Sequence, residues 1–501
     1  MMQTPLNGTR AAWAALGGDP ALVSRVSVVP RAGALPARLP VMGLARACVG
    51  VCALAAAEST AYRTGREVPR VRVDDGAVAT AFTSERQLLV DGRAPVSFAP
   101  LSRFWRTADG WVRTHANYPH HRAALTAALG LTPSVEADAV GALLAERSAV
   151  EVEDAVYAAG GLAVALRSPR EWAAHPQGAA VAGRPLLLRE RIDEGPARPL
   201  PPLDGDPALP AQGLRVLDLT RVIAGPVATR TLALLGADVL RVDPPGLPEL
   251  PDQHADTGFG KRSATLDLGA RADRRAFDDL LERADVVVTG YRPGALDRFG
   301  LSPEALAGRR PGAVLAQLSA WGADGPWAGR RGFDSLVQAA TGIAAVEGSA
   351  ERPGALPAQA LDHGTGHLLA AAVLRSLTER SLTGGTYLAR LALAHTAAWL
   401  TGPAAEGLAE PGEDLAEPGE DLAEPGEDLA EPGEADGSGP SGGPSDGRPA
   451  AAYDGPWPWL AETDGPLGRL RHALPPFSFA GGPANWARPP GPWGGDLPRW
   501  L

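Results

Sequence analysis

Between residues 214 and 400 the sequence alternates short apolar segments with helical segments, and this alternation limits the possible folds more than any other feature. The segments 214–219, 239–242, 286–289 and 313–319 are predicted as strands. Helices are predicted between them, at 228–235, 274–283 and 303–307. Strands that alternate with helices form a parallel sheet with helices on both faces. Ligands of such sheets gather beyond the carboxyl ends of the strands.

The segments that follow these strands are rich in Gly, Pro and basic residues. They include 220–226 (TRVIAGP), 290–294 (GYRPG) and the turn 258–262 (GFGKR), which holds Lys261, the only lysine of the chain. Gly and Pro let backbone approach a ligand, and Arg and Lys supply charge for phosphates. The sequence has no GxGxxG after the first strand and no P-loop motif, which argues against a dinucleotide cofactor and against ATP hydrolysis.

A seven-residue unit, LAEPGED, repeats from residue 408 to about residue 434 and is followed by a Gly-, Ser- and Pro-rich stretch. Pro and Gly in every unit exclude a continuous helix, and the acids outnumber the apolar residues that a core needs. We therefore expect residues 403–450 to form a disordered acidic linker. Residues 404–436 carry thirteen acids and no base, so they account for the net charge of −11. The nearly neutral remainder predicts neither a nucleic-acid surface nor a membrane surface.

Cys48 and Cys52 are the only cysteines, and their spacing places both on one face of an apolar helix. Buried free thiols are the expected state, and no metal site is predicted. The N-terminus lacks the basic start and apolar core of a signal peptide. The longest apolar run, 47–57, is shorter than the about 20 residues that span a bilayer. These features predict a cytoplasmic protein.

Two distant segments resemble each other. Residues 48–82 and 367–400 each combine an Ala/Leu-rich helix, a Thr-Gly stop and a strand-like alternation. Chance similarity between two Ala-rich helices is the alternative to an internal repeat. In a repeat, Gly43 would stand at the position equivalent to Asp362, so the first copy would lack a carboxylate there.

Asp362 lies just ahead of the predicted helix 367–380, in the sequence LDHGTG. From its type and position alone it is predicted to cap this helix, because Asp is a favoured N-cap residue. His363 and His367, at i, i+4 spacing, are candidates either for substrate contact or for lining the helix.

Five segments, in this order and spacing, resemble the family III CoA-transferases of the carnitine-dehydratase and bile-acid-inducible type. They are LRVLDLTRVIAGPVATRTLALLGADVLRVDPP, GFGKRSATLDL, ADVVVTGYRPGALDRFGL, AWGADGPWAGRRGFDSLVQAATG and LTERSLTGG. The resemblance implies an α/β fold with a parallel-sheet, Rossmann-like domain. It also implies an enzyme that moves CoA from an acyl-CoA to a small carboxylic acid. CoA would then be a substrate and not a permanently bound cofactor.

By this resemblance Asp362 is the nucleophile. Its carboxylate would attack the acyl-CoA carbonyl, and a mixed anhydride and then an aspartyl-CoA thioester would follow. The residues that match CoA-contacting positions of the family are Ile223, Ala224, Lys261, Gly290, Tyr291, Arg292, Arg298 and Arg331.

The chain departs from the family pattern in two places. Family racemases carry a His directly before the Asp of the Gly-x-Asp segment, and this chain has Phe333 there, which disfavours racemisation. Segments that resemble the family's smaller domain, 105–122 and 168–178, lie near the N-terminus. The resemblance therefore implies a rearranged or fused two-copy member. Its parts are a partial copy forming a smaller α+β domain (1–205), the CoA-transferase domain (211–402), the linker (403–450) and a tail packing on that domain (451–501).

Three functions remain open at this point. A CoA-transferase is the first. The alternatives are a catalytically impaired acyl-CoA-binding protein, because the family's Gly-rich acceptor-side loop is not found, and an acyl-CoA racemase or isomerase. The family forms interlocked homodimers, and in a fused chain the N-terminal copy is an alternative source of the partner's contribution.

Overall fold

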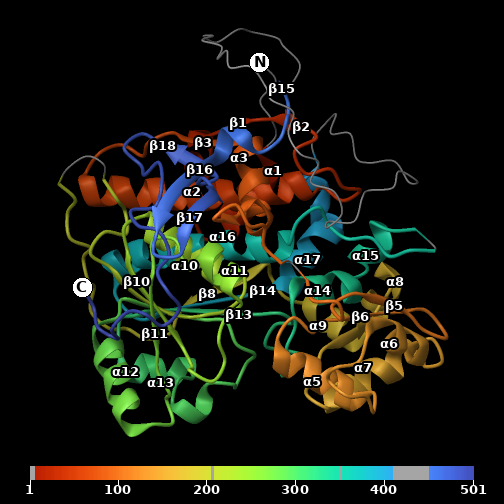
Figure 1. Ribbon diagram of the computed structural model, residues 1–501. Helices are drawn as coiled ribbons and strands as arrows, with labels where there is room; N and C mark the ends of the chain where they lie inside the picture. Colours follow the sequence, from red (N-terminus) through yellow and green to blue (C-terminus); the bar gives the residue numbers. More distant parts are fainter. Residues whose placement is uncertain (1–5, 97, 205–207, 350, 410–450) are drawn as a thin grey trace.

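A seven-stranded sheet lies at the centre of the computed structural model, which describes residues 6–96, 98–204, 208–349, 351–409 and 451–501 (Figure 1). The strand order is β11-β10-β9-β12-β13-β14-β8. The strands are β8 (Leu187–Arg191), β9 (Arg215–Leu219), β10 (Asp238–Asp243), β11 (Arg262–Thr265), β12 (Val286–Thr289), β13 (Val314–Ser319) and β14 (Tyr387–Ala392). All neighbours pair in parallel except β8, which pairs antiparallel with β14.

The predicted α/β fold with a parallel sheet is confirmed. The four predicted strands correspond to β9, β10, β12 and β13, with no boundary off by more than one residue. β8 was not predicted, and β11 begins at Arg262, inside the segment predicted as a turn. Most of the predicted linker, from residue 410 to residue 450, lies outside the described residues.

Helices cover both faces of the sheet because side chains alternate along each strand. On one face, Val216 and Val286 belong to the same buried cluster as the helices α10 (Ala224–Leu234) and α16 (Ala360–Thr383). On the other face, Leu217 and Val287 pack in a cluster with α12 (Arg271–Arg283) and α13 (Pro303–Arg309). The carboxyl ends of the parallel strands are thereby left for a ligand.

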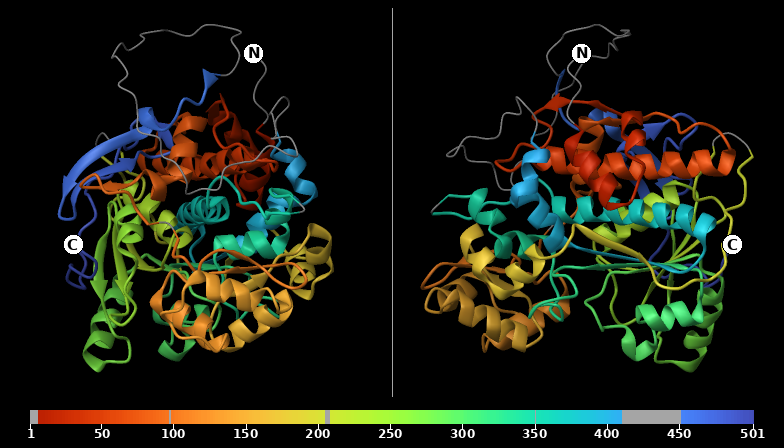
Figure 2. Two further views of the ribbon diagram at one scale, coloured as in Figure 1. Left: turned by 45° about the vertical axis from the view of Figure 1, so that its right-hand side comes forward. Right: turned by 180° about the vertical axis from the view of Figure 1, so that it is seen from behind.

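The helix α2 (Val41–Thr64) lies against α16 and forms a further layer above it (Figures 1 and 2). Each of these two helices has 24 residues, of which 21 are buried. A helix that is apolar on all sides is stable only between other layers of structure. The buried free thiols predicted for Cys48 and Cys52 are confirmed on α2.

By length and composition alone, α2 could cross a membrane, because its most apolar 18-residue window has a mean hydropathy of 1.6. The expectation that no segment reaches this length was wrong, because the helix extends well beyond the apolar run 47–57. However, 94% of its most apolar window is buried inside the protein, as in the core helix of a globular fold. The cytoplasmic location stays a prediction.

The strands and helices after α2 follow the same order as those after α16. α2 leads to β3 (Val71–Asp74) and α3 (Asp75–Phe82), and α16 leads to β14 and α17 (Leu393–Thr401). β3 pairs in parallel with β1 (Val26–Val29) and antiparallel with β18 (Phe477–Phe479), just as β14 pairs with β13 and β8. Gly43 and Asp362 are each the third residue of their helix. These correspondences favour the internal repeat, which stays a prediction.

Residues 101 to 183 form a lobe beside the sheet, orange to gold at the lower right of Figure 1. Leu125, Val140 and Val156 belong to a core of its own. Its elements are β5 (Phe104–Arg106), β6 (Trp111–Thr114), α5 (Pro119–Ala128), α6 (Ala137–Leu144), α7 (Ala149–Ala158), β7 (Ala163–Ala165), α8 (Pro169–Ala174) and α9 (Pro176–Ala182). The predicted segment 1–205 is thus divided among α2 and its neighbours, this lobe, and strand β8 of the central sheet.

The C-terminal tail contacts both the N-terminal part of the chain, at β4, and the central sheet. Its hairpin of β16 (Leu460–Gly465) and β17 (Gly468–Ala473) pairs with β4 (Leu89–Val90), and residues after 485 run along β10 and β11. The remaining short elements are α1 (Asn7–Ala15), β2 (Arg31–Ala32), α4 (Ser84–Gln87), α11 (Pro251–Thr257), α14 (Asp334–Thr341), α15 (Ile343–Val346) and β15 (Ala451–Ala452).

Replacing Leu369 by Ala should lower the free energy of unfolding by about 2–5 kcal/mol, because Leu369 is fully buried in the core that α16 shares with α2. Urea denaturation measures this loss. Leu382→Ala is the matched control, since Leu382 lies on the same helix but is 62% exposed, and its effect should stay within about 0.5 kcal/mol. Equal losses in the two variants would contradict the buried position of α16.

Candidate functional site

A cavity of about 70 Å³ opens next to Asp362. We call it the Asp362 cavity. One wall comes from the segment after β9 and from the first turns of α14 and α16; the residues are Val222, Ile223, Phe333, Asp334, Ser335, Gln359 and Asp362. Most of the opposite wall comes from the N-terminal part of the chain, namely Glu85, Arg86, Pro95, Val96, Phe98, His115, Asn117 and Tyr118. The cavity is therefore complete only when both parts of the chain are present.

Asp362 lies in the first turn of α16 and is not its N-cap. The helix begins at Ala360, seven residues before the predicted start, and its N-cap is Gln359, without a side-chain capping bond. The N–H of Asp362 instead donates to Oδ2 of Asp334, at 2.9 Å. The predicted capping role of Asp362 is therefore wrong, because the carboxylate of another helix accepts the free N–H at this helix end.

Asp334 and Asp362 are two buried carboxyls that affect each other. Burial is the main cause that raises the pKa of Asp362 well above its ordinary value, and the charges of Asp334 and Glu85 raise it further. Burial also raises the pKa of Asp334 to about 6, against hydrogen bonds from Gln338 and from the N–H groups of α16. Two like charges so close cannot both ionise easily, so the pair tends to hold a proton.

A buried histidine and a glutamate pair with each other beside Asp362. Nε2 of the fully buried His363 lies 3.1 Å from Oε2 of Glu85, which α4 contributes. The ring of Phe82 stacks on His363 at 5.3 Å between centroids and on His367 at 5.8 Å. Sequence spacing left both histidines open between substrate contact and helix lining. In the structure His363 is a partner of Glu85, and Nδ1 of His367 donates to the backbone oxygen of His363 at 2.9 Å.

The turn between β9 and α10 is held in a strained conformation. Val222 has a φ of 69°, a value that a β-branched residue adopts only when its surroundings enforce it. Its N–H donates to Oε2 of the buried Glu249 at 3.0 Å. This contact places Ile223 in the cavity wall and makes Ala224 the first residue of α10, where free N–H groups favour negative charge.

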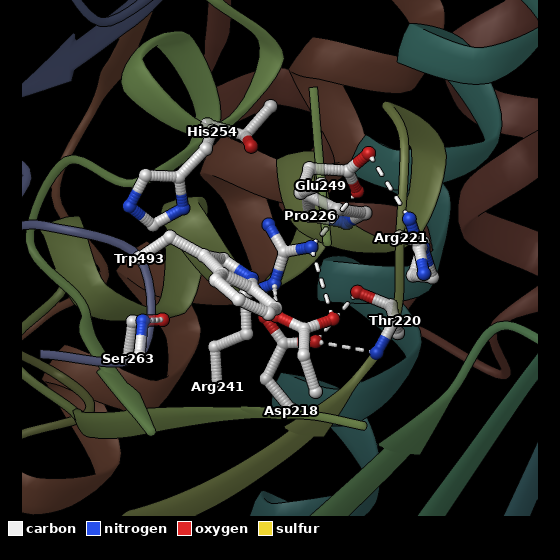
Figure 3. A network of polar contacts seen from close by, with 12 residues as sticks. Asp218, Thr220, Arg221, Pro226, Arg241, Glu249, His254, Ser263 and Trp493 are labelled. Carbon is white, nitrogen blue, oxygen red and sulfur yellow. Dashed lines mark hydrogen bonds and ion pairs between the residues drawn. The ribbon is translucent and has the colours of Figure 1, made fainter. Parts of the chain in front are cut away.

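A buried network of charges lies behind this turn, at the carboxyl ends of β9 and β10 (Figure 3). Arg241 contacts Asp243 at 2.7 Å and Glu249 at 2.8 Å. Glu249 also accepts from the hydroxyl of Tyr118. Although burial opposes ionisation, Arg241 and Arg221 lower the pKa of Glu249 to about 2. Glu249 is therefore a fixed negative charge that connects the lobe to the sheet.

Lys261 belongs to the same network. Its Nζ lies 3.1 Å from Oδ2 of Asp218 and 2.9 Å from the backbone oxygen of Pro226, and only 3% of the residue is exposed. Burial lowers its pKa to about 8, against the charge of Asp218. Lys261 lines neither cavity described for this structure. Lys261 thereby connects β9 to α10, and its predicted contact with CoA stays a prediction.

A second cavity, of about 230 Å³, lies at the carboxyl ends of β12, β13 and β14. Tyr291 and Arg292, both predicted as CoA contacts, line it together with Arg184, Arg390 and His395. Arg184 is paired with Asp324 at 2.7 Å, and Arg390 donates to Gln317 at 3.0 Å. This cavity therefore gathers cations at the sheet edge where ligands of α/β folds bind.

The other predicted contact residues lie elsewhere. Gly290 packs against Thr220, Arg298 lies exposed over the ring of Phe299 at 4.6 Å, and Nη1 of the exposed Arg331 lies 3.5 Å from Nε2 of His121. Together with Ala224, these residues line neither the Asp362 cavity nor the second cavity. The structure thus brings together Asp362 with Ile223, and Tyr291 with Arg292. Among the described residues, no group of three metal-ligating side chains is found.

Comparison with known proteins gives the same family as the sequence motifs. The family model described as CoA-transferase family III matches residues 211–424. The chain carries a CoA-transferase family III domain. A probable fatty acyl-CoA transferase of Mycobacterium tuberculosis is 36% identical to it over 205 residues, which cover 38% of this chain and 51% of the relative.

Two further relatives carry related names. An acyl-CoA transferase of Gibberella moniliformis is 32% identical over 308 residues, 56% of this chain and 53% of the relative. A formyl-CoA:oxalate CoA-transferase of Streptomyces avermitilis is 34% identical over 196 residues, 37% of this chain and 48% of the relative. The chain spans about half the length of the curated relatives it matches.

Several residues in or next to the Asp362 cavity were not predicted from the sequence. Asp334 was noted only as the neighbour of Phe333, although an Asp at the start of a helix is a recognisable signal. Glu85, Tyr118 and Glu249 gave no signal of their own, because each acts across a long stretch of chain: Glu85 contacts His363, and Tyr118 contacts Glu249.

The rate of any reaction that uses ionised Asp362 should rise with pH at values well above the ordinary carboxyl pKa, because burial and the charge of Asp334 raise the pKa of Asp362. Asp334→Asn removes the like charge, so the pKa of Asp362 should fall and the rise should move to lower pH, while burial still holds it above its ordinary value. The pH dependence of kcat/KM measures this shift, with the exposed Asp279→Asn as control. An unchanged profile in Asp334→Asn would show that the two carboxyls are not coupled.

Proposed function

We propose that this protein is a CoA-transferase that moves CoA from an acyl-CoA to a carboxylic acid, with Asp362 as the nucleophile. The observation that carries the proposal is the position of Asp362. It is a carboxyl in the wall of a cavity beside the turn that follows β9, within a CoA-transferase family III domain. The relatives named above support acyl-CoA as donor and a carboxylic acid as acceptor.

In the first proposed step, an Asp362 oxygen attacks the thioester carbonyl and CoA leaves as a thiolate, which gives an acyl-aspartyl anhydride. The thiolate then attacks the aspartyl carbonyl, which releases the donor acid and leaves an aspartyl-CoA thioester. The acceptor acid attacks this thioester and the thiolate returns to the acceptor's carbonyl, so the carboxylate of Asp362 is restored. The N–H groups at the start of α10, next to Ile223 in the cavity wall, are candidates to stabilise the oxyanions.

CoA itself is proposed to extend toward the second cavity. Arg292, Arg184 and Arg390 there supply the positive charge that its phosphates need, and Tyr291 supplies an aromatic surface. CoA is a substrate in this proposal, and no permanently bound cofactor is invoked. We further propose a cytoplasmic enzyme without a nucleic-acid or membrane partner. In this chain the N-terminal part supplies the opposite wall of the Asp362 cavity. In a homodimer, a partner subunit would supply a wall of this kind.

A catalytically impaired acyl-CoA-binding protein is the second candidate. The observation that favours it is the raised pKa of Asp362, because a neutral carboxyl is not a nucleophile. An acyl-CoA racemase or isomerase is the third. A histidine, His115, does lie in the same cavity, stacked on Phe333 at 3.7 Å, but burial lowers its pKa to about 3, which makes it a weak base. Deuterium exchange at the α-carbon of an acyl-CoA without CoA transfer would identify this activity.

Asp362→Asn should reduce CoA transfer by about a thousandfold or more, because the amide cannot form the anhydride. Incubation of the wild-type protein with an acyl-CoA should give a CoA adduct on Asp362 that mass spectrometry detects and hydroxylamine cleaves. The exposed Asp279→Asn should keep both activity and adduct. Full turnover by Asp362→Asn would exclude Asp362 as the nucleophile. Tight acyl-CoA binding without adduct or turnover in the wild type would favour the impaired binding protein.

A further inference from the structure

The charges around the Asp362 cavity are unbalanced. Of the described residues that line it, Glu85, Asp252, Asp334 and Asp362 are acidic, and Arg86 is the one arginine or lysine. Arg86 is already engaged, because its Nη1 donates to the backbone oxygen of Pro357 at 2.9 Å and its Nε lies 3.9 Å from Glu85. His115 is neutral, since burial lowers its pKa to about 3. The lining therefore offers an entering anion little positive charge, because the guanidinium of Arg86 already contacts Glu85 and Pro357.

Glu85 is the acid that the N-terminal part contributes to this wall, close enough to Asp362 for its charge to act on it. Asp252 is paired with Arg93, and Asp334 is occupied by the N–H of Asp362 and by Gln338. Glu85 is held in place by Nε2 of His363 at 3.1 Å. Burial opposes its ionisation, but the hydrogen bond and charge of His363, together with Arg86, lower its pKa below the ordinary value. Glu85 is therefore negative at neutral pH.

Much of the remaining cavity wall is apolar. Pro95, Val96 and Phe98 come from the segment after β4, and Ile223, Leu250 and Phe333 lie beside them. The uncharged polar residues of the wall are Asn117, Tyr118, Gln253, Ser335 and Gln359, and the hydroxyl of Tyr118 already donates to Glu249. Val96 is 73% exposed, which places an apolar side chain at the protein surface next to the cavity. Apolar surface of this kind accepts hydrocarbon, and the negative charge of Glu85 beside it repels a second carboxylate.

We propose that Glu85 makes the acceptor side of this site selective for monocarboxylic acids with an apolar chain and excludes dicarboxylic acids. This inference rests on the proposed CoA-transferase function. One oxygen of the acceptor attacks the carbonyl of the aspartyl-CoA thioester, CoA leaves as a thiolate, and the thiolate then takes the acceptor's acyl group from the anhydride. The acceptor's reacting carboxylate is consumed in this step, whereas a second carboxylate stays charged beside Glu85.

The N-terminal part of the chain would then determine specificity. Asp362, Asp334 and Ile223 belong to the CoA-transferase domain, whereas Glu85 and the apolar residues 95, 96 and 98 lie outside the segment that the family model matches. A relative of Streptomyces avermitilis is named for oxalate, a dicarboxylate, and it aligns with this chain over 196 residues only. This chain is instead proposed to exclude dicarboxylates. The residues responsible would be Glu85 and its apolar neighbours in the N-terminal wall of the cavity.

The test compares acceptors at one fixed acyl-CoA donor. Propanoate and butanoate should be used with a kcat/KM about tenfold or more above that of oxalate and succinate, because the second charge is not compensated. Monomethyl succinate separates charge from size, since it has one carboxylate but is larger than succinate. It should be accepted better than succinate; the opposite order would show that volume and not charge excludes the dicarboxylate, and would overturn the proposal.

Glu85→Gln should reduce the preference for monocarboxylates by about tenfold, whereas Glu282→Gln, a change on the exposed side of α12, should leave it unchanged. Loss of Glu85 also lowers the pKa of Asp362, but this affects every acceptor alike, so the ratio of two kcat/KM values isolates selectivity. Equal use of both acid classes by the wild type, or an unchanged ratio in Glu85→Gln, would overturn the proposal. Absence of CoA transfer to any acid would instead disprove the proposed function, and the wild-type series remains decisive if Glu85→Gln does not fold.

Discussion

The packing of α2 against α16 is the constraint on which the rest of the structure depends. α16 is buried on the sheet side by α10 and the strands and on the other side by α2, so neither the CoA-transferase domain nor the N-terminal part encloses it alone. The few charged residues at its far end are paired, as Arg375 is with Glu58 of α2 and with Glu379. A helix enclosed in this way carries its first turn, and Asp362 with it, out of water.

This burial has a direct electrostatic consequence for Asp362. A carboxyl removed from water resists ionisation, and the nearby charges of Asp334 and Glu85 add to that resistance. The positive end of α16 acts in the opposite direction, but the carboxylate of Asp334 already occupies one of its N–H groups. A carboxyl in such a site ionises most readily when a bound substrate places compensating positive charge or hydrogen-bond donors next to it. The proposed reactivity of Asp362 is therefore linked to occupancy of the cavity.

Much of the sheet was predictable from the sequence, and much of the site was not. β9, β10, β12 and β13 are apolar runs bounded by turn residues, so local pattern alone located them within one residue at each end. The start of α16 was not predictable, because the carboxylate that satisfies its N-terminal N–H comes from Asp334, on another helix. Lys261 fell at a family contact position, yet it is buried against Asp218, which no local pattern indicates. Glu85 was missed for the same reason: its partner His363 is 278 residues away in sequence.

The two similar helices also bear on how many sites one chain holds. Gly43 takes the place in α2 that Asp362 takes in α16, and a Cβ at Gly43 would lie 1.9 Å from the backbone oxygen of Leu408. No side chain fits there, so a carboxylate at this position would need a rearranged backbone after α17. The internal repeat stays a prediction; within it, backbone occupies the position of α2 that corresponds to the Asp362 carboxyl. The N-terminal part then has one role at the site: it completes the wall of the cavity, and through that wall it would select which acids reach Asp362.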